Sequence, residues 1–461
     1  MAELIDELRD LDRRDTRRAW WFGLGMVGVL LMIIGFVWAR DVAPPDDSAM
    51  LPVLTGGNGK ENGLRKFIDE VRAMPDSGFD DLSMEARSRE WGNTEELRTF
   101  LGKNEARIEA WKRLMMSDRS GWRWGLQDVE PLDMKIDMSY LLAVQETANV
   151  IRMKSLLLAR DGKIGEGVDM ALDLWRMGGG QRRAQGALIH WLVSLTIESI
   201  GLAALEDAVM AGDCDDPTLV RIQEALAQVE ESPCKTLKFT YQVEYLMMKN
   251  SLEFMPDYLA ENANLNWAKP VIRAGYKRNY TLSSYIYYHE PLVNSGGGDA
   301  LAMMRKSKWR TKQLEAWRDR GWWKYVHPNG MGQWMVASVA TFGRIDERAA
   351  MMETLPGLTQ LMLAVRRYEV ERGTMPDALD ELVPEFINRL PIDPLNGKPF
   401  RWDAVSQRGY SVFLNEVDDG GSYTKSRRPD ELDCGVFYPW GEEAVEQRKE
   451  QYGVKGEKQS E

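Results

Sequence analysis

Histidine and cysteine, the residue types that most often build metal and redox sites, are scarce in this sequence. The only histidines are His190, His289 and His327, and no two of them have the spacing of a zinc-binding motif. His190 stands among apolar residues on a predicted helix, so we expect it to be a buried core residue. Three cysteines are too few for a disulfide scaffold. Cys214 and Cys234 would either pair in an oxidising compartment or remain separate buried thiols.

The signatures of phosphate-loop enzymes and serine hydrolases are also missing. The glycine triplets 178–180 and 296–298 are not followed by the Lys-Ser/Thr of a phosphate loop. Ser295 precedes the second triplet but lacks the first glycine of a nucleophile elbow. We therefore predict no catalytic residue and no cofactor. We expect the first triplet to separate two helices, with Arg182 and Arg183 on the surface where the second helix begins.

Basic residues are in the minority. Lysine and arginine number 59 against 71 aspartates and glutamates, which gives a net charge of −12 and a pI near 5.1. Because nucleic-acid binding needs a concentrated basic face, we do not expect a nucleic-acid partner. Aromatic residues are plentiful, with 17 tryptophans, and indicate a globular protein rather than a disordered one. A chain of 461 residues has room for two or three domains.

Residues 19–39 form one long apolar run, AWWFGLGMVGVLLMIIGFVWA. A helix of about 20 apolar residues spans the bilayer core. The run exceeds the apolar region of about 7–15 residues in a signal peptide and no small-residue cleavage site follows it. An uncleaved anchor is thus favoured over a cleaved signal or a buried soluble helix. The basic residues before the run predict a cytoplasmic N-terminus and a periplasmic C-terminal bulk in a bacterial inner membrane: Arg9, Arg13, Arg14, Arg17 and Arg18.

Apolar residues recur at helical spacing from residue 59 to residue 335. Short polar connections between the predicted helices favour antiparallel neighbours. This pattern predicts a mainly α, irregular helical ectodomain. Residues 156–177 resemble one tetratricopeptide-type hairpin, so a solenoid-like arrangement is one form that it could take. The predicted helices are Lys60–Met74, Thr94–Met116, Met138–Arg160, Ile164–Met177, Arg182–Met210 and Thr218–Val229.

The pattern changes after residue 336. A helix is predicted to begin at Pro356 and to stop at Gly373, with one apolar face formed by Leu358, Leu361, Met362, Val365 and Tyr368. Strand-like residues at 400–402 and 410–414 predict a hairpin, and residues 436–438 could add a third strand. We therefore expect a small α+β module here.

Residues 349–421 resemble the C-terminal part of the type II secretion major pseudopilins. In that family a helix ends in Gly-x-x-Pro and is followed by Leu-x-x-Leu-x-Pro, a Pro-x-Asp-Pro-x-x-Gly-x-Pro turn and a small hairpin. The matching residues are Gly373, Pro376, Leu379, Leu382, Pro384, Pro391, Asp393, Pro394, Gly397, Pro399 and Tyr410. The resemblance implies the fold of the module. Because a long helical region separates the module from the predicted anchor, we do not expect a pilin subunit.

The same resemblance implies a calcium loop. Asp418 and Asp419 could supply oxygen ligands to calcium, and the alternative is a solvated acidic turn. A longer span is similar to uncharacterised, membrane-anchored bacterial families typical of planctomycetes, and this similarity brings no known activity. It runs from ETANVIRMKSLLLARDGK, which begins at Glu146, through His-Pro-Asn-Gly at 327–330 to Asp-Asp-Gly-Gly at 418–421.

Six segments are predicted along the chain. They are a cytoplasmic tail (1–18), a transmembrane helix (19–39), a linker (40–58), a periplasmic α-helical domain (59–335), a pseudopilin-like α+β module (336–440) and a charged tail (441–461).

Two functions follow from this organisation. The leading hypothesis is a protein-interaction or scaffold component of the bacterial envelope, with a link to secretion implied by the resemblance. It would be anchored by residues 19–39 and bind an envelope protein. The alternative is a membrane-anchored periplasmic hydrolase that uses carboxylates such as Glu146 or Glu198. Paired carboxylates leave no local motif, so a deep pocket that holds two carboxyl groups with shifted pKa values would favour the hydrolase.

Overall fold

The computed structural model describes most of the chain between residues 40 and 412. The described residues are 26–29, 35, 40–55, 61–88, 92–129, 131–133, 136–211, 214–228, 232–262, 266–274, 276–294, 300–320, 327–340, 345–405, 407–412, 418 and 434–437. They are mainly helical, as the apolar periodicity predicts. The chain divides into two compact units. Unit 1 comprises Met1–Asp46, Ser251–Tyr287 and Gln313–Ala340, and unit 2 comprises Asp47–Asn250, Tyr288–Lys312 and Thr341–Glu461.

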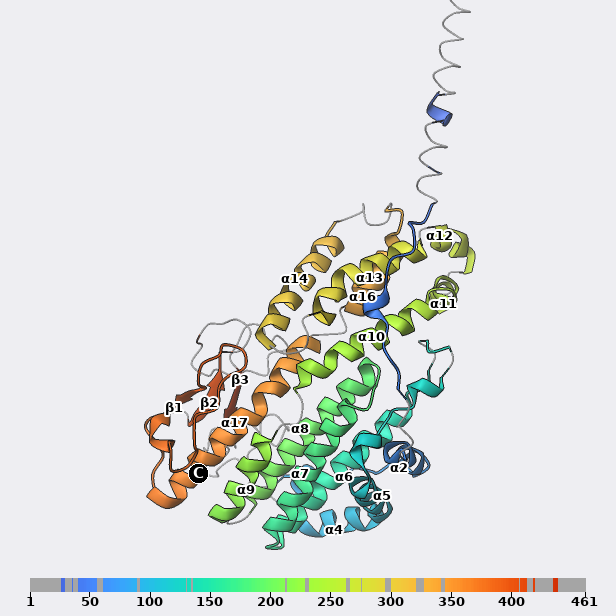
Figure 1. Ribbon diagram of the computed structural model, residues 1–461. Coiled ribbons are helices and arrows are strands. Elements are labelled where there is room, and N and C mark those ends of the chain that lie inside the picture. Colours follow the sequence, from blue (N-terminus) through green and yellow to red (C-terminus); the bar gives the residue numbers. More distant parts are fainter. Residues whose placement is uncertain are drawn as a thin grey trace, which may run out of the picture. The chain divides into compact units, whose positions relative to one another are not determined.

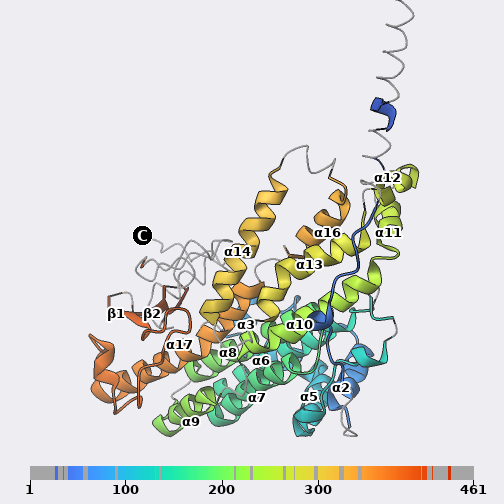
Figure 2. The same cartoon turned by 45° about the horizontal axis from the view of Figure 1, so that its top comes forward.

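The centre of unit 2 is formed by three long helices joined by short turns, α6, α7 and α8, which lie side by side in Figures 1 and 2. Shorter helices cover α6 on one side, and α9 packs against α7. Helices α6 and α8 end at their predicted positions, Arg160 and Met210, because polar turns interrupt the apolar pattern there. Helix α7 continues beyond its predicted end at Met177 to Arg182. The bounds are α2 Gly63–Arg72, α3 Met84–Arg87, α4 Thr94–Lys103, α5 Glu105–Met116, α6 Tyr140–Arg160, α7 Ile164–Arg182, α8 Leu188–Met210, α9 Asp216–Ala227 and α10 Pro233–Ser251, with 3₁₀ turns η1 Ser48–Met50, η2 Arg119–Gly121 and η3 Leu126–Asp128.

Helix α8 is the core helix of unit 2. Within the described part of the chain it alone is long and apolar enough to cross a membrane, by length and composition only, and 67% of its most apolar window is buried. Its neighbours α6 and α7 supply that burial, which is the usual situation of a helix that is apolar on all sides. The predicted membrane span at 19–39 lies outside the described residues except for 26–29 and 35.

The prediction that glycines 178–180 separate two helices is wrong. All three lie inside α7, which continues to Arg182, and α8 begins only at Leu188. Glycine weakens a helix by about 0.5–1 kcal/mol relative to alanine but does not interrupt its backbone hydrogen bonds. At Gly178 and Gly180, close packing against neighbouring side chains and backbone offsets that cost. The chain reverses instead at residues 183–187, where Gln185 has a φ of 58°.

The C-terminal part of unit 2 combines one long helix with a three-stranded sheet. The strands are antiparallel in the order β1-β2-β3, with Trp402 opposite Gly409 and Gly409 opposite Val436. The hairpin predicted from the aromatic and β-branched residues is therefore present, and the third strand pairs with its second strand. The bounds are α17 Ile345–Arg372, η5 Leu379–Leu382, β1 Arg401–Asp403, β2 Arg408–Ser411 and β3 Cys434–Phe437.

Helix α17 begins earlier than predicted. Pro356 lies inside the helix, although proline removes one backbone hydrogen bond and usually marks the first turn. The residues before it, Ala349, Ala350 and Met352, are buried, and these tertiary contacts hold the extra turns in place. The predicted stop at Gly373 is confirmed. Gly373 has a φ of 73°, and its N–H donates to the carbonyl of Glu369 at 2.8 Å.

The predicted apolar face of α17 forms the core of this part. The buried cluster and its partly buried neighbours come from the helix, from η5 and the loops on either side of it, and from the start of β1. They include Leu358, Leu361, Met362, Ala364, Val365, Leu382, Phe386 and Phe400, with Tyr368, Met375, Leu379, Ile387, Leu390 and Trp402 at the edge.

The proline-rich turn before β1 is organised by a buried aspartate. Asp393 accepts hydrogen bonds from the N–H of Leu395 at 2.9 Å and from the hydroxyl of Ser411 on β2 at 2.6 Å. Gly397, with a φ of 70°, donates its N–H to the carbonyl of Asp393 at 2.9 Å. Burial raises the pKa of the Asp393 carboxyl. The Pro-x-Asp-Pro-x-x-Gly-x-Pro spacing thus corresponds to a turn whose aspartate bonds to its own backbone and to the neighbouring strand.

Unit 1 is helical in its described part. The His-Pro-Asn-Gly segment connects two of its helices, because Asn329 accepts from the N–H of Lys277 at 2.7 Å and lies within hydrogen-bond distance of the Thr281 hydroxyl. Asn329 is fully buried. The elements are α11 Met255–Asn262, η4 Asn266–Ala268, α12 Lys269–Ala274, α13 Arg278–Val293 up to Tyr287, α14 Ala300–Arg318 from Gln313, and α16 Gly330–Ala340.

The described part of the predicted linker is attached to the folded units rather than free. In unit 1, the Asp41 carboxylate accepts from the N–H groups of Asn279 at 2.7 Å and Tyr280 at 3.0 Å, and so caps the start of α13. In unit 2, Asp47 accepts from the Tyr245 hydroxyl at 2.6 Å and pairs with Lys249 at 2.5 Å.

Residues further along the same segment continue these attachments in unit 2. Met50 is fully buried, and the side chain of Gln242 donates to the carbonyl of Ala49 at 2.9 Å. The side chain of Gln185 donates to the Thr55 hydroxyl at 2.8 Å. The prediction of a linker at 40–58 rests on local composition. These contacts depend on residues distant in sequence, so local composition does not reveal them.

Candidate functional site

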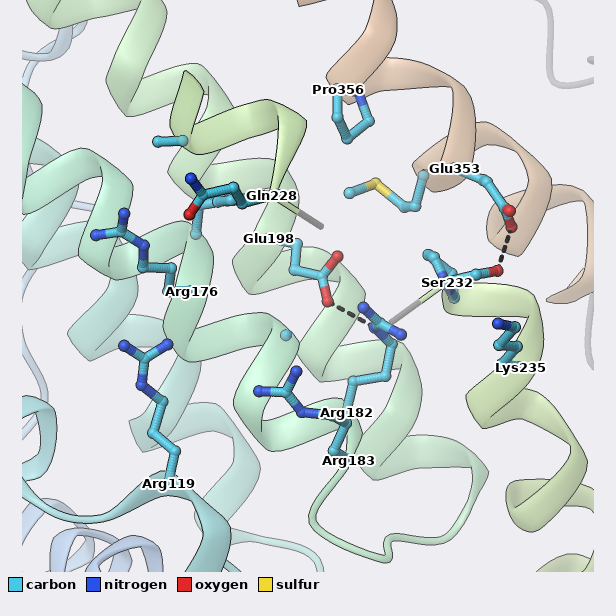
Figure 3. Close-up of a pocket in the computed structure, with 15 residues that line it drawn as sticks. Arg119, Arg176, Arg182, Arg183, Glu198, Gln228, Ser232, Lys235, Glu353 and Pro356 are labelled. Atoms are coloured by element: carbon cyan, nitrogen blue, oxygen red, sulfur yellow. Dashed lines mark hydrogen bonds and ion pairs between the residues drawn. The ribbon is translucent and has the colours of Figure 1, made fainter. Parts of the chain in front are cut away.

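A pocket of about 490 Å³ opens in unit 2 beside α7 and α8 (Figure 3). The turn η2, the end of α9, the start of α10 and the middle of α17 complete its wall. Its volume lies in the range of about 300–1,000 Å³ that is usual for small-molecule sites. The lining residues are Arg119, Trp175, Arg176, Gly179, Arg182, Arg183, Glu198, Ala225, Gln228, Ser232, Pro233, Lys235, Met352, Glu353 and Pro356.

Helix α7 supplies one side of the pocket from a single face. Trp175, Gly179 and Arg182 follow one another at intervals of four and three residues, which places them on one stripe of the helix. Arg176 and Arg183, seven residues apart, form the adjacent stripe. The expectation that Arg182 and Arg183 start a helix is therefore wrong. They end α7, where positive charge interacts favourably with the helix dipole.

A buried ion pair, Arg182 with Glu198, forms part of the pocket lining. The Arg182 Nε donates to Glu198 Oε1 at 2.7 Å, and the two side chains are only 4% and 5% exposed. The Arg182 Nη1 also donates to the Thr236 hydroxyl at 3.1 Å, which in turn accepts from Trp191 Nε1 at 3.0 Å. Removing one partner of a buried pair costs about 3–5 kcal/mol, so this arrangement holds the guanidinium in one position.

Positive charge predominates in the pocket lining. Five cationic side chains and two carboxylates line it. Glu198 is paired with Arg182, and the second carboxylate, Glu353, accepts from the Ser232 hydroxyl at 2.7 Å. Arg176 donates to Asp173 on the same helix at 3.1 Å. A partly enclosed cleft with an excess of one charge concentrates ions of the opposite sign, so the pocket favours anions.

The three glycines of α7 have different surroundings. A Cβ on Gly178 would lie 2.6 Å from the backbone nitrogen of Glu198, and a Cβ on Gly180 would lie 2.8 Å from the ring of Trp122. Both positions therefore need glycine for close packing. A Cβ on Gly179 would meet nothing closer than Glu198 Oε1 at 3.8 Å and Arg182 Nη2 at 3.9 Å. Only the middle glycine faces the pocket.

The structure separates the two carboxylates named from the sequence. Glu198 lines the pocket, whereas Glu146 pairs with buried Arg107 at 3.1 Å and accepts from the N–H of Ser77 at 3.2 Å. The second carboxylate in the pocket is Glu353, which sequence reasoning missed. No local spacing could have indicated it, because Glu353 and Glu198 lie on helices far apart in the chain.

His190 is a fully buried core residue, as predicted. Its Nδ1 accepts from the N–H of Ala187 at 3.1 Å, so in the neutral imidazole Nε2 carries the proton and faces the Tyr140 hydroxyl at 2.5 Å. The ring packs on Trp124 with centroids 4.5 Å apart. Burial lowers the pKa of His190 from 6.5 to about 3. His190 is thus neutral over the physiological range and does not line the pocket.

Because the pKa of His190 is lower in the folded state than in the unfolded state, acid should destabilise the protein through this residue. Its contribution is complete above pH 6.5 and is lost as the pH falls from 6.5 towards 3. At pH 5 the loss is expected to be about 2 kcal/mol. Urea unfolding of the wild type and of His190→Gln at pH 7 and pH 5 would measure it. Equal changes in unfolding free energy for both proteins would contradict the expectation.

A second polar cluster of unit 2 is closed to solvent. Asp346 on α17 accepts from Tyr241 at 2.5 Å, from Ser307 at 2.5 Å and from Arg310 at 2.5 Å. The ring of His289 lies against Tyr241 with centroids 5.8 Å apart. All five side chains are buried. Burial, followed by the charge of Asp346, raises the pKa of Tyr241 well above 10. The cluster links four helices, α10, α13, α14 and α17, and does not line the pocket.

The predicted calcium ligands are only partly described. Asp418 pairs with Arg401 and accepts from the Tyr410 hydroxyl at 3.0 Å, whereas Asp419 lies outside the described residues. Within the described residues no group of three or more His, Cys, Asp or Glu side chains could hold a metal ion. The calcium site stays a prediction.

The two described cysteine side chains are separate thiols. Cys214 and Cys234 are both free and buried. Burial raises the pKa of Cys214 to about 11 and also raises that of Cys234. Both groups are therefore protonated and unreactive at neutral pH.

Comparison of the whole chain with protein families, with curated proteins and with solved structures gives no significant match.

Proposed function

We propose that this chain is a membrane-anchored helical binding protein of the bacterial envelope, and that the pocket of unit 2 receives an anionic group of its partner. The observation that carries the proposal is the lining of five cationic side chains around two carboxylates. Arginine is suited to this task because its guanidinium forms paired hydrogen bonds with carboxylate or phosphate and keeps its charge at every physiological pH.

The anchor is residues 19–39, with the N-terminus in the cytoplasm and the C-terminal bulk in the periplasm. Its length and flanking arginines support this topology. The described residues of the run add a further argument. Residues 26–29 are helical, and Met26, Val27 and Val29 are 62%, 52% and 51% exposed. An apolar helix with exposed side chains finds its most favourable surroundings in lipid.

The module built on α17 serves, in this proposal, as a pseudopilin-like cap that links the protein to envelope assemblies. The stop of α17 at Gly373 and the turn around Asp393 support the resemblance. The cap packs on the helices of its own unit, since Gln223 of α9 donates to the carbonyl of Gln360 at 3.2 Å. The short turn between α6 and α7 likewise fits a tetratricopeptide-type hairpin.

A second candidate function is hydrolysis, because Glu198 and Glu353 share the pocket. Binding is favoured over it, since one oxygen of Glu198 is occupied by the buried Arg182 and is not free to act as a base.

Site-specific crosslinking of the full-length protein in membranes tests the proposal. A photo-crosslinking residue at Gln228, an exposed residue of the pocket lining, is expected to capture the partner in the wild type. The Arg176→Gln/Arg183→Gln double variant is expected to reduce capture by about tenfold or more, because charge-assisted hydrogen bonds contribute about 1.5–3 kcal/mol each.

A matched control for the crosslinking is Arg113→Gln/Arg221→Gln. These exposed arginines of unit 2 pair with Glu70 and Asp169 and are not among the lining residues of the pocket, so their loss should leave capture unchanged. Capture that survives in the pocket variant, or falls equally in both variants, would refute the proposed role of the pocket.

A further inference from the structure

We infer that the ligand of the pocket is an organic phosphate and that Gly179 keeps open the space for its phosphate group. This inference rests on the proposed function, because it names the class of anion that the pocket receives. It starts from the glycine triplet of α7, a sequence feature that close packing explains only in part.

Packing accounts for two of the three glycines. Side chains at positions 178 and 180 would collide with α8 and with Trp122, as described above. Gly179 has no such neighbour, and a Cβ there would make ordinary contacts of 3.8 and 3.9 Å. Glycine is a poor residue for a helix interior, so alanine at 179 would favour the helix without a clash. The space over Gly179 therefore needs a reason other than packing, and the pocket supplies one.

Arginines surround the space beside Gly179, and the nearest carboxylate oxygen, Glu198 Oε1, is held by Arg182. Arg176 and Arg183 flank Gly179 on the same face of α7, and the Cδ of Arg119 lies 3.5 Å from a Cβ position on neighbouring Gly180. Figure 3 shows the guanidinium groups of Arg119, Arg176 and Arg183 on the same side of the pocket, away from Glu353. A phosphomonoester carries a charge of about −1.5 to −2 at pH 7 and three acceptor oxygens, so it matches several guanidiniums better than a single carboxylate does.

The other side of the pocket fits an organic group. Met352 and Pro356 of α17 are buried residues that contribute apolar surface there, and Trp175 adds an aromatic ring. In Figure 3 Pro356 lies away from Arg119 and Arg183. A pocket of about 490 Å³ is much larger than inorganic phosphate requires. A ligand with a phosphate at one end and an apolar or aromatic part at the other would fill it. A soluble phosphomonoester and a lipid phosphate headgroup share this chemistry.

Calorimetric titration of the full-length protein in zwitterionic nanodiscs tests the inference, with phenyl phosphate as the probe. Phenyl phosphate is expected to bind at least tenfold more tightly than inorganic phosphate, which lacks the ring, and than benzoate, which lacks the dianion. Gly179→Leu should weaken phenyl phosphate binding at least tenfold while thermal stability stays equal or rises.

Nanodiscs with added phosphatidic acid distinguish the two sources of the phosphate group, a lipid headgroup and a soluble phosphomonoester. Competition with phenyl phosphate supports a lipid headgroup, and undiminished binding supports a soluble ligand.

Gly165→Leu is the matched control, because Gly165 lies in the same helix with nothing within 4 Å of its Cβ position. It should leave binding unchanged. If Arg176→Gln/Arg183→Gln abolishes binding of phenyl phosphate but Gly179→Leu does not, the inference about Gly179 fails and the proposed anion-binding pocket stands. If neither variant changes binding, the inference and the proposed pocket function both fail. Benzoate binding as tightly as phenyl phosphate would also overturn the inference. Should Gly179→Leu unfold, Gly179→Ser serves instead, and unchanged binding in a folded serine variant would overturn it.

Discussion

Asp346→Asn is expected to lower the free energy of unfolding by about 3 kcal/mol or more, because it leaves the buried charge of Arg310 without its counter-ion. Arg310 is 5% exposed and Asp346 is 1% exposed, so water cannot replace the lost interaction. The asparagine keeps the size of the side chain, and the loss therefore reports the charge rather than a cavity. Urea unfolding followed by circular dichroism would measure it.

A double variant separates the effect of the lost ion pair from the effect of the other hydrogen bonds to Asp346. Arg310→Met combined with Asp346→Asn removes both charges and should recover part of the stability, because a buried ion pair replaced by apolar groups is often neutral. A loss below about 1 kcal/mol in Asp346→Asn would mean that the site is hydrated or that the pair is not formed. A double variant no more stable than the single one would assign the loss to the hydrogen bonds from Tyr241 and Ser307.

Val365→Asp is expected to cost several kcal/mol, because it places an unpaired carboxylate in the core formed by α17, η5 and the hairpin. Val365 is fully buried in the cluster with Leu361, Phe386 and Phe400. Limited proteolysis should show faster cleavage between residues 373 and 412 in the variant. Val370→Asp is the matched control, since Val370 lies on the same helix and is 55% exposed. Equal cleavage rates in the two variants would contradict the packing described here.

The structure changes how far the unfolding caused by Val365→Asp is expected to extend. From the sequence, the C-terminal module is predicted to unfold by itself and to leave the preceding helices intact. In the structure both belong to unit 2. The side chain of Gln223 on α9 donates to the carbonyls of Gln360 and Phe386, and Arg367 pairs with Asp216 at 2.5 Å. We therefore expect the effect of Val365→Asp to extend to α9.

Helices with a continuous apolar pattern and clear ends could be predicted from the sequence. Helix α6 begins two residues after its predicted start and ends at Arg160, and Asp215 caps α9 by accepting from the N–H of Thr218 at 3.1 Å. The predicted helix Thr94–Met116 is divided at Asn104, whose buried side chain donates to the carbonyls of Ser77 and Phe100. That division depends on a tertiary contact, which the local pattern does not contain.

The pocket could not be predicted because its residues come from η2, α7, α8, α9, α10 and α17. Of the lining residues, sequence reasoning had singled out Arg182, Arg183, Glu198 and one glycine triplet, each for another reason. Spacing along a helix indicates which residues share a face. For residues 175–183 the spacing is sufficient to predict that Trp175, Gly179 and Arg182 lie on one side of α7. It does not indicate which other element faces them, and Glu353 is recognisable as a pocket residue only after α17 is placed.

The hydrogen bonds of Asp41 to the first turn of α13 limit the length of free chain between the proposed membrane span and unit 1. With residues 19–39 in the bilayer, as proposed, only Arg40 stands between the span and a residue already fastened to unit 1. Two residues of extended chain reach about 7 Å. The start of α13 would then stay beside the lipid headgroups, and unit 1 would be held at the membrane surface rather than on a long flexible spacer.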